Sequence, residues 1–200
     1  MFNTTIATQI YAKICFEATN SQKKIIEKLL EYLSDDDFSR IFVLNGFAGT
    51  GKTTLIAALV AALKELRIKP VLLAPTGRAA KVLARYCGEQ ALTIHKRIYR
   101  QRTNADYESK FSLDFNREQG AVFIVDEASM LSDSTGDGAL FGSGSLLEDL
   151  VSYVRSGRGC RLILVGDSAQ LPPVGCDFSP ALDPATVSRY GEVVYGLMDE

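Results

Sequence analysis

The chain contains 200 residues, of which 46% are hydrophobic and 23% are charged, and its formal net charge is −2. This composition suits one globular domain with a core, and it excludes a disordered tail or a strongly basic protein. No apolar run approaches the roughly 18 residues of a membrane span, and residues 1–10 lack a basic, hydrophobic leader. The cysteines Cys15, Cys87, Cys160 and Cys176 form no C-x-x-C pair, so we expect unpaired thiols. We therefore expect a cytoplasmic protein with no membrane partner.

Short apolar runs alternate along the chain with segments of helical periodicity. The first such helix covers residues 21–33, with its isoleucines and leucines on one face and Asn20 or Ser21 as its cap. The pattern then predicts a strand over 40–46, a helix over 51–68, a strand over 71–75, a helix over 77–86, a strand over 121–125, a helix over 146–156 and a strand over 161–165. Continuous apolar strands between amphipathic helices indicate an α/β fold, a mainly parallel sheet with helices on both faces.

Two polar stretches interrupt this alternation. Residues 100–120 are irregular, although alternation in KFSLDF (110–115) predicts a short strand there. Residues 132–145 are rich in Gly and Ser, as surface loops are. Ligands of parallel sheets bind at the carboxyl ends of the strands, so the polar residues directly after each strand are the candidates for function.

A phosphate-binding motif follows the first predicted strand. GFAGTGKT (46–53) fits G-x-x-x-x-G-K-[ST] in full, between a strand and a helix. Its glycines let backbone N–H groups surround phosphate oxygens, Lys52 would reach the β- and γ-phosphates, and the Thr53 hydroxyl would ligate Mg²⁺. The alternative, a glycine-rich turn that merely matches, holds in about one case in twenty. The expected nucleotide contacts are Gly46, Ala48, Gly49, Thr50, Gly51, Lys52, Thr53 and Thr54.

Two adjacent carboxylates, Asp126 and Glu127, follow the third strand. Alone they could simply cap a helix. Together with the phosphate-binding motif, Asp126 is expected to hold Mg²⁺ and Glu127 to orient or deprotonate water. This pair favours ATP hydrolysis over simple nucleotide holding.

The segment after the second strand, APTGRAAKVL (74–83), is a candidate for contact with an anionic backbone through Pro75, Thr76 and Arg78. A helix start capped by Thr76 with a solvated Arg78 is about equally plausible. The net acidity of the chain counts mildly against nucleic-acid binding, but residues 78–102 carry seven Lys or Arg residues against one acidic residue. The same segment includes His95, the one histidine of the chain, and a lone histidine is more often structural.

The fourth strand ends in LVGDSAQLPPVG (164–175). Asp167 lies at the predicted nucleotide edge, and Gln170 can present its amide to a γ-phosphate and lose that contact on hydrolysis. Pro172 and Pro173 stiffen the backbone that follows, so a shift at Gln170 could move a rigid segment. The alternative is a surface loop in which a buried Asp167 caps backbone amides.

Taken together, these motifs resemble the superfamily-1 DNA helicases of the RecD-like branch, which includes Dda-type enzymes. The resemblance rests on GFAGTGKTT, APTGRAAKVL, TIHK, VDEASM and VGDSAQLPPVG, in this order, and it spans residues 46–175. It implies a RecA-like P-loop NTPase domain that uses ATP and Mg²⁺ to move along single-stranded DNA with 5′-to-3′ polarity. It also implies catalytic roles for Lys52, Asp126, Glu127 and Gln170, and DNA contacts for Pro75, Thr76, Arg78 and His95. NSQKKII is similar to the family's adenine-contacting motif, which would make Gln22 an adenine contact.

The expected organisation is an N-terminal segment over 1–38 and a first motor domain over 39–200. Helicases of this kind need a second RecA-like domain that supplies arginine fingers, worth roughly 10³–10⁵ in rate for related phosphoryl transfer. We expect that domain, and possibly recombination or repair subunits, as partners, and we expect the fragment alone to hydrolyse ATP poorly. Two alternatives stay open: a nucleotide-gated binding or regulatory module, and a weaker one, a small-molecule kinase.

Overall fold

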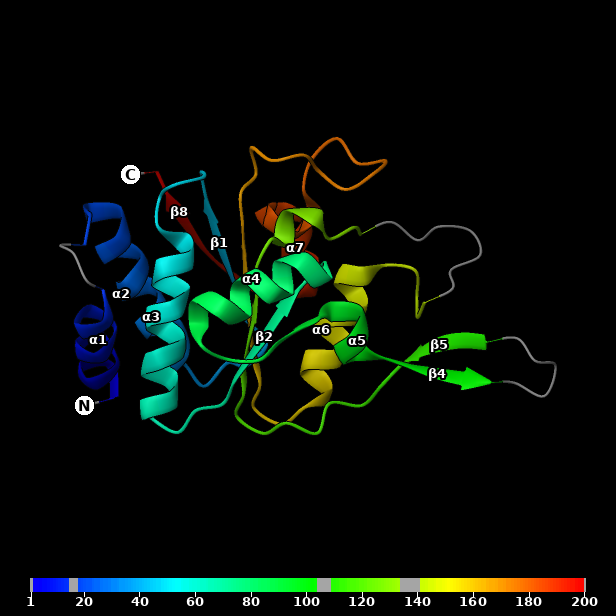
Figure 1. Cartoon of the computed structure of the whole chain (residues 1–200), viewed down its shortest axis with the longest axis horizontal. Coiled ribbons are helices and arrows are strands. Elements are labelled where there is room, and N and C mark those ends of the chain that lie inside the picture. The colour runs from blue at the N-terminus through cyan, green and yellow to red at the C-terminus, as the bar shows by residue number, and fades with distance from the viewer. Residues whose placement is uncertain (1, 15–17, 104–108, 134–140, 200) are drawn as a thin grey trace.

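The computed structural model describes residues 2–14, 18–103, 109–133 and 141–199. Within them, six strands form one sheet in the order β3-β2-β6-β7-β1-β8, and every neighbouring pair is parallel (Figure 1). The strands are β1 (Ile41–Gly46), β2 (Pro70–Ala74), β3 (Ala91–Thr93), β6 (Val122–Val125), β7 (Arg161–Gly166) and β8 (Val193–Met198). The predicted parallel α/β architecture is confirmed.

Helices cover both faces of the sheet, because successive strand side chains point to opposite sides. In β1, Phe42 and Leu44 enter one core cluster, and Ile41 and Val43 enter the other. The first cluster is covered by α1 (Phe2–Lys13), α2 (Asn20–Ser34), α3 (Lys52–Glu65) and α4 (Gly77–Cys87). The second is covered by α5 (Ile94–Ile98), α6 (Leu146–Ser156) and α7 (Pro184–Val187). The sheet is therefore buried on both sides, as its apolar strands require.

The N-terminal helices share the core of the sheet. Ile6 and Ile10 of α1 are fully buried in the same cluster as Leu59 of α3. The cap of α2 is Thr19, and the prediction of Asn20 or Ser21 is wrong. Thr19 and Gln22 form a reciprocal capping box, in which each side chain accepts a hydrogen bond from the backbone of the other.

The second half of the chain adds elements that the sequence pattern did not predict. β8 lies beside β1 at the edge of the sheet, and its Met198 is buried in the core. The predicted short strand in KFSLDF is β5 (Ser109–Leu113), which pairs antiparallel with β4 (Tyr99–Thr103) and projects from the body (Figure 1). Residues 104–108 and 134–140, which include half of the predicted 132–145 loop, lie outside the described residues.

Cys87, Cys160 and Cys176 are free thiols, and Cys160 is buried. Cys15 lies outside the described residues. In the described part of the chain, no helix is both long enough and apolar enough to cross a membrane.

Candidate nucleotide site

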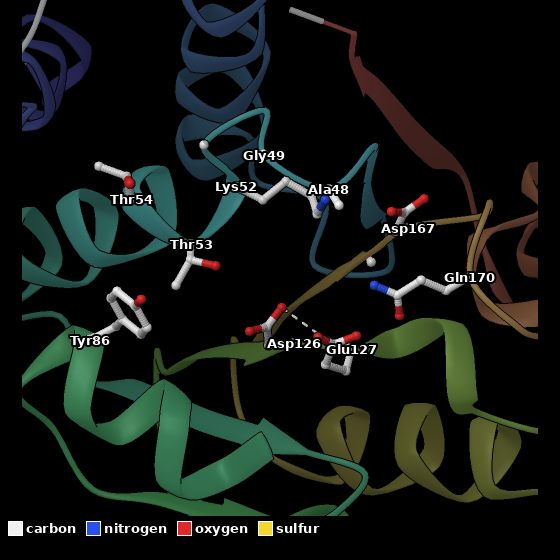
Figure 2. Close-up of a pocket in the computed structure, with 12 residues that line it drawn as sticks. Ala48, Gly49, Lys52, Thr53, Thr54, Tyr86, Asp126, Glu127, Asp167 and Gln170 are labelled. Carbon is white, nitrogen blue, oxygen red and sulfur yellow. Dashed lines mark hydrogen bonds between the residues drawn. The ribbon is translucent and has the colours of Figure 1, made fainter. Parts of the chain in front are cut away.

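Four strand ends meet at one edge of the sheet, because β1, β2, β6 and β7 run in the same direction. The segments that follow them carry the four predicted motifs. A pocket of about 390 Å³ opens at this edge (Figure 2). Its lining includes the predicted residues Ala48, Gly49, Gly51, Lys52, Thr53, Thr54, Asp126, Glu127, Asp167 and Gln170. Residues from three strand ends thus converge on one cavity.

The loop between β1 and α3 has the shape of a phosphate cradle. Gly51 caps α3 in the left-handed region (φ 86°) and offers no side-chain hydrogen bond to the first turn. The unbonded N–H groups at a helix start attract anions, and here no side chain of the cap competes for them. A Cβ on Gly46 would lie 2.8 Å from the carbonyl oxygen of Met198, so only glycine lets the loop start so close to β8. These residues fit a nucleotide phosphate.

Lys52 lies in the pocket and folds over the loop. Its Nζ donates hydrogen bonds to the carbonyl oxygens of Gly46 (2.5 Å) and Phe47 (2.7 Å). Thr50, which does not line the pocket, closes the loop by donating from Oγ1 to the same Phe47 oxygen at 2.9 Å. The ammonium group is therefore held at the loop, within reach of a phosphate bound there.

The acidic pair faces the same cavity from β6. Burial raises the pKa of Asp126, against the hydrogen bond from the Glu127 amide and the charge of Lys52. Burial also raises the pKa of Glu127, and the neighbouring Asp126 raises it further. The Asp126 Oδ1 accepts a hydrogen bond from the Glu127 amide at 3.0 Å (Figure 2). Glu127 has φ 56°, a left-handed conformation that a non-glycine residue rarely adopts and that is often found at functional sites.

The turn after β7 is held by Asp167. This residue is 3% exposed, and its Oδ1 accepts a hydrogen bond from the Ala169 amide at 2.9 Å. The alternative reading of Asp167 as a backbone cap is thus present in the structure, although Asp167 also lines the pocket. Its carbonyl oxygen accepts from the Gln170 amide, and the exposed Gln170 side chain reaches into the pocket opposite Glu127 (Figure 2).

The sequence motifs did not predict two of the residues at this edge, Asn45 and Tyr86. Asn45, a buried polar residue within the apolar β1, donates to Ser168 Oγ (2.8 Å) and Tyr195 Oη (2.9 Å) and accepts from the Ser168 amide. These hydrogen bonds connect β1 to the turn after β7 and to β8. An asparagine within an apolar strand sequence could have indicated such a buried polar contact. Tyr86 of α4 lines the pocket, and no motif pointed to it.

Gln22 lies beneath the phosphate loop and does not line the pocket. Its Nε2 donates to the Thr50 carbonyl oxygen at 3.2 Å, and its Oε1 accepts from the Thr19 amide at 3.1 Å. A Cβ on Gly51 would meet this Nε2 at 2.8 Å. Gln22 therefore braces the loop from behind, and its contact with adenine stays a prediction.

A second pocket of about 270 Å³ adjoins the first and shares Asp126 and Glu127 with it. Thr76 and Arg78 line this second pocket, and Pro75 does not. Thr76 also caps α4, since its Oγ1 accepts from the Ala79 amide at 3.1 Å, as the alternative interpretation stated.

His95 lies apart from both pockets. Its half-buried ring contacts Tyr99 and Phe141, with ring centroids 5.6 and 5.0 Å away. Burial lowers the pKa of His95, which favours the neutral ring. These contacts give it a packing role, and a DNA contact for His95 stays a prediction.

The polar groups fit a magnesium nucleotide. Mg²⁺ is usually bound by one or two carboxylates together with phosphate oxygens and water. Thr53 and Asp126 line the phosphate pocket together. The described residues contain no cluster of three or more His, Cys, Asp or Glu side chains that could hold a metal by itself. Thr53 offers a hydroxyl and Asp126 a carboxylate, and both are oxygen ligands of the kind that Mg²⁺ takes beside nucleotide phosphates.

The family model described as AAA domain matches residues 17–177. This chain belongs to that family. It is 30% identical over 154 residues to the ATP-dependent RecD2 DNA helicase of Deinococcus radiodurans, covering 77% of this chain and 19% of that protein. It is 35% identical over 158 residues to the RecBCD enzyme subunit RecD of Mycobacterium tuberculosis, covering 67% of this chain and 24% of that protein.

Two further comparisons agree. The chain is 34% identical over 136 residues to the ATP-dependent DNA helicase dda of Enterobacteria phage T4, covering 66% of this chain and 28% of that protein. The crystal structure of Pif1 helicase from Candida albicans matches with a TM-score of 0.57 and 21% identity, covering 92% of this chain and 40% of that chain. The resemblance to the RecD-like helicases and the RecA-like fold are confirmed. The chain spans between 19% and 28% of the length of these three curated relatives.

Proposed function

We propose that this chain is the first motor domain of a DNA helicase, which couples ATP hydrolysis to movement along single-stranded DNA. One observation carries the proposal: the nucleotide pocket and the pocket of Thr76 and Arg78 share Asp126 and Glu127 as a common wall. Loss of the γ-phosphate would change the charge beside Asp126 and Glu127. The same two carboxylates border Thr76 and Arg78, whose side chains are suited to contact a DNA backbone. The helicase names of the relatives support the same activity.

In this proposal the residues of the nucleotide pocket divide the work of hydrolysis. The loop amides and Lys52 bind the phosphates, and Thr53 with Asp126 would hold Mg²⁺. Bound Mg²⁺ supplies neutralisation of charge on the phosphate oxygens. Glu127 orients the attacking water and accepts its proton. Its raised pKa suits that task, because a general base works best when its pKa approaches the operating pH.

Gln170 is proposed to sense the γ-phosphate. Its turn is fixed from below by Asp167 and, through Ser168, by Asn45. Pro172 restricts the backbone that follows, so that loss of the Gln170 contact would shift the segment as a unit.

We further propose that a second RecA-like domain docks at the mouth of the nucleotide pocket and supplies arginine fingers. The segment that follows the sensor turn carries the exposed apolar side chains Leu171, Val174 and Phe178, and the phosphate loop carries the exposed Phe47. In the proposal, docking of the second domain would cover these side chains. Without that domain we expect slow hydrolysis. Movement in the 5′-to-3′ direction and association with recombination or repair subunits are proposed from the resemblance of the motifs to RecD-like helicases. The name of one relative, the RecBCD enzyme subunit RecD, supports assembly into a larger enzyme.

The proposal is tested by the affinity of this chain for a fluorescent single-stranded oligonucleotide, measured with Mg·ADP and with a non-hydrolysable Mg·ATP analogue. We expect the two dissociation constants to differ by about fivefold or more, a common size of coupling between sites. Lys52→Ala should abolish the difference. Lys24→Ala, an exposed lysine of α2 away from the pocket, should preserve it. Equal affinities in both nucleotide states would contradict the motor and favour a nucleotide-holding module.

A further inference from the structure

Tyr86 is exposed on the surface of α4 and yet lines the nucleotide pocket. The buried positions of this helix are Ala80 and Leu83, and Tyr86 contributes little to the core because 65% of its surface is exposed. It is the one aromatic side chain among the described residues that line this pocket. The groups assigned to hydrolysis do not include it. Its position therefore calls for a different contact with the ligand.

The pocket has two distinguishable ends. Glu127 and Gln170, which act on the terminal phosphate in the proposed function, lie at one end (Figure 2). Thr54 and Tyr86 lie at the other, beyond Lys52 (Figure 2). A triphosphate with its terminal phosphate between Glu127 and Gln170 must extend across Lys52, so its nucleoside emerges at the end that Tyr86 lines.

The side-chain amide of Gln22, the adenine contact that the sequence resemblance implies, is already hydrogen-bonded within the protein. Both ends of the Gln22 amide have partners, Thr50 for Nε2 and Thr19 for Oε1, and Gln22 does not line the pocket. An aromatic ring, by contrast, offers a face on which a base can stack, and such stacking is tolerant of base identity.

We infer that the Tyr86 ring stacks on the base of the bound nucleotide, an inference that rests on the proposed nucleotide site. Tyr86 is then the principal contact of this domain to the nucleoside, and the phosphate loop is the contact to the triphosphate. Because the ring makes no hydrogen bonds to the edge of the base, stacking should raise the affinities of ATP and GTP by similar factors.

The test compares the affinities of ATP, GTP and inorganic triphosphate, each with Mg²⁺, by isothermal titration calorimetry on this chain. Tyr86→Ala should weaken ATP and GTP about tenfold, equivalent to about 1.4 kcal/mol, and leave inorganic triphosphate unchanged. Tyr86→Phe should bind all three as the unaltered chain does. Tyr11→Ala, another exposed tyrosine, on α1 and outside the pocket, is the matched control and should change nothing. Circular dichroism checks that each variant is folded.

Two results would overturn the inference and leave the proposed function intact. One is ATP binding by Tyr86→Ala as tight as by the unaltered chain. The other is an equal loss for ATP and inorganic triphosphate, which would indicate a distorted phosphate loop. If the unaltered chain bound none of the three ligands, the proposed nucleotide site itself would be wrong, and the inference would fail with it.

Discussion

Two pockets of about 390 Å³ lie at opposite edges of the same sheet, and they differ in how their charged groups are held. At the carboxyl edge, Lys52 faces two carboxylates whose pKa values are raised by burial. At the amino edge, Arg161 begins β7 and is 6% exposed. Its guanidinium lies 4.6 Å from the Phe38 ring centroid and 5.4 Å from that of Tyr32.

The two cavities have similar volumes, so volume alone does not distinguish the proposed nucleotide site from a structural cavity. The Arg161 Nη2 donates to the Asp35 carbonyl oxygen, and the aromatic rings hold the guanidinium, while its Nη1, which has no partner among the described residues, is shielded from solvent. The Arg161 guanidinium therefore holds the segment after α2, which includes Asp35 and Phe38, against the sheet. At the carboxyl edge the acidic pair and the start of α3 stay open to a ligand. Substitutions at the carboxyl edge should therefore mainly change ATP hydrolysis, and substitutions at the amino edge should mainly change stability.

The largest expected effect is on catalysis at the carboxyl edge. Glu127→Gln keeps the shape of the side chain and removes the proposed general base, so ATP hydrolysis should fall by about 10²–10³-fold while Mg·ATP binding is retained. Phosphate release at saturating ATP measures the first, and calorimetry the second. Glu31→Gln, on the exposed face of α2, is the control. A hydrolysis rate within a fewfold of the unaltered chain would assign the water-activating role elsewhere.

A smaller effect, on stability alone, is expected at the amino edge. Arg161→Met keeps much of the side-chain volume but loses the hydrogen bond to Asp35 and the ring contacts, so the free energy of unfolding should fall by about 2 kcal/mol. Urea denaturation measures this, and nucleotide affinity should not change. The exposed Arg158→Met, at the same edge, should cost little. A weaker nucleotide affinity in Arg161→Met would show that the two edges are coupled.

The smallest expected effect is a change in stability at the carboxyl edge. Burial raises the folded-state pKa of Asp126 above its ordinary value of 3.8, so the charged carboxylate lowers stability at neutral pH, and this cost disappears as the pH falls through the folded pKa. Asp126→Asn should therefore raise the free energy of unfolding at pH 7 without Mg²⁺ by on the order of 0.5–1 kcal/mol. The gain should shrink in urea titrations at lower pH, and the exposed Asp177→Asn should show none. Loss of stability at pH 7 would contradict this account.

The nucleotide edge could be predicted because its residues follow apolar strands directly, and parallel strands bring their ends together. Other features depend on contacts across the chain. The β8 segment, in which Gly196 interrupts the apolar pattern, becomes a strand by pairing with β1, from Ile41 with Val193 to Gly46 with Met198. Tyr86 has the periodicity of a solvent-facing residue, and only the packing of α4 places it over the pocket. His95 belongs to an aromatic cluster whose member Phe141 lies far away in the sequence.

The left-handed backbone of Glu127 has a consequence for selection. At φ 56° every residue with a Cβ is disfavoured, and glycine would relieve the strain at once. A library screened only for heat resistance would therefore tend to enrich replacements that delete this carboxylate. If Glu127 activates water as proposed, the selected variants would be more stable but would hydrolyse ATP slowly. A screen intended to keep the proposed ATPase activity must therefore select for turnover and heat resistance together, because stability and the proposed catalytic role favour different residues at this position.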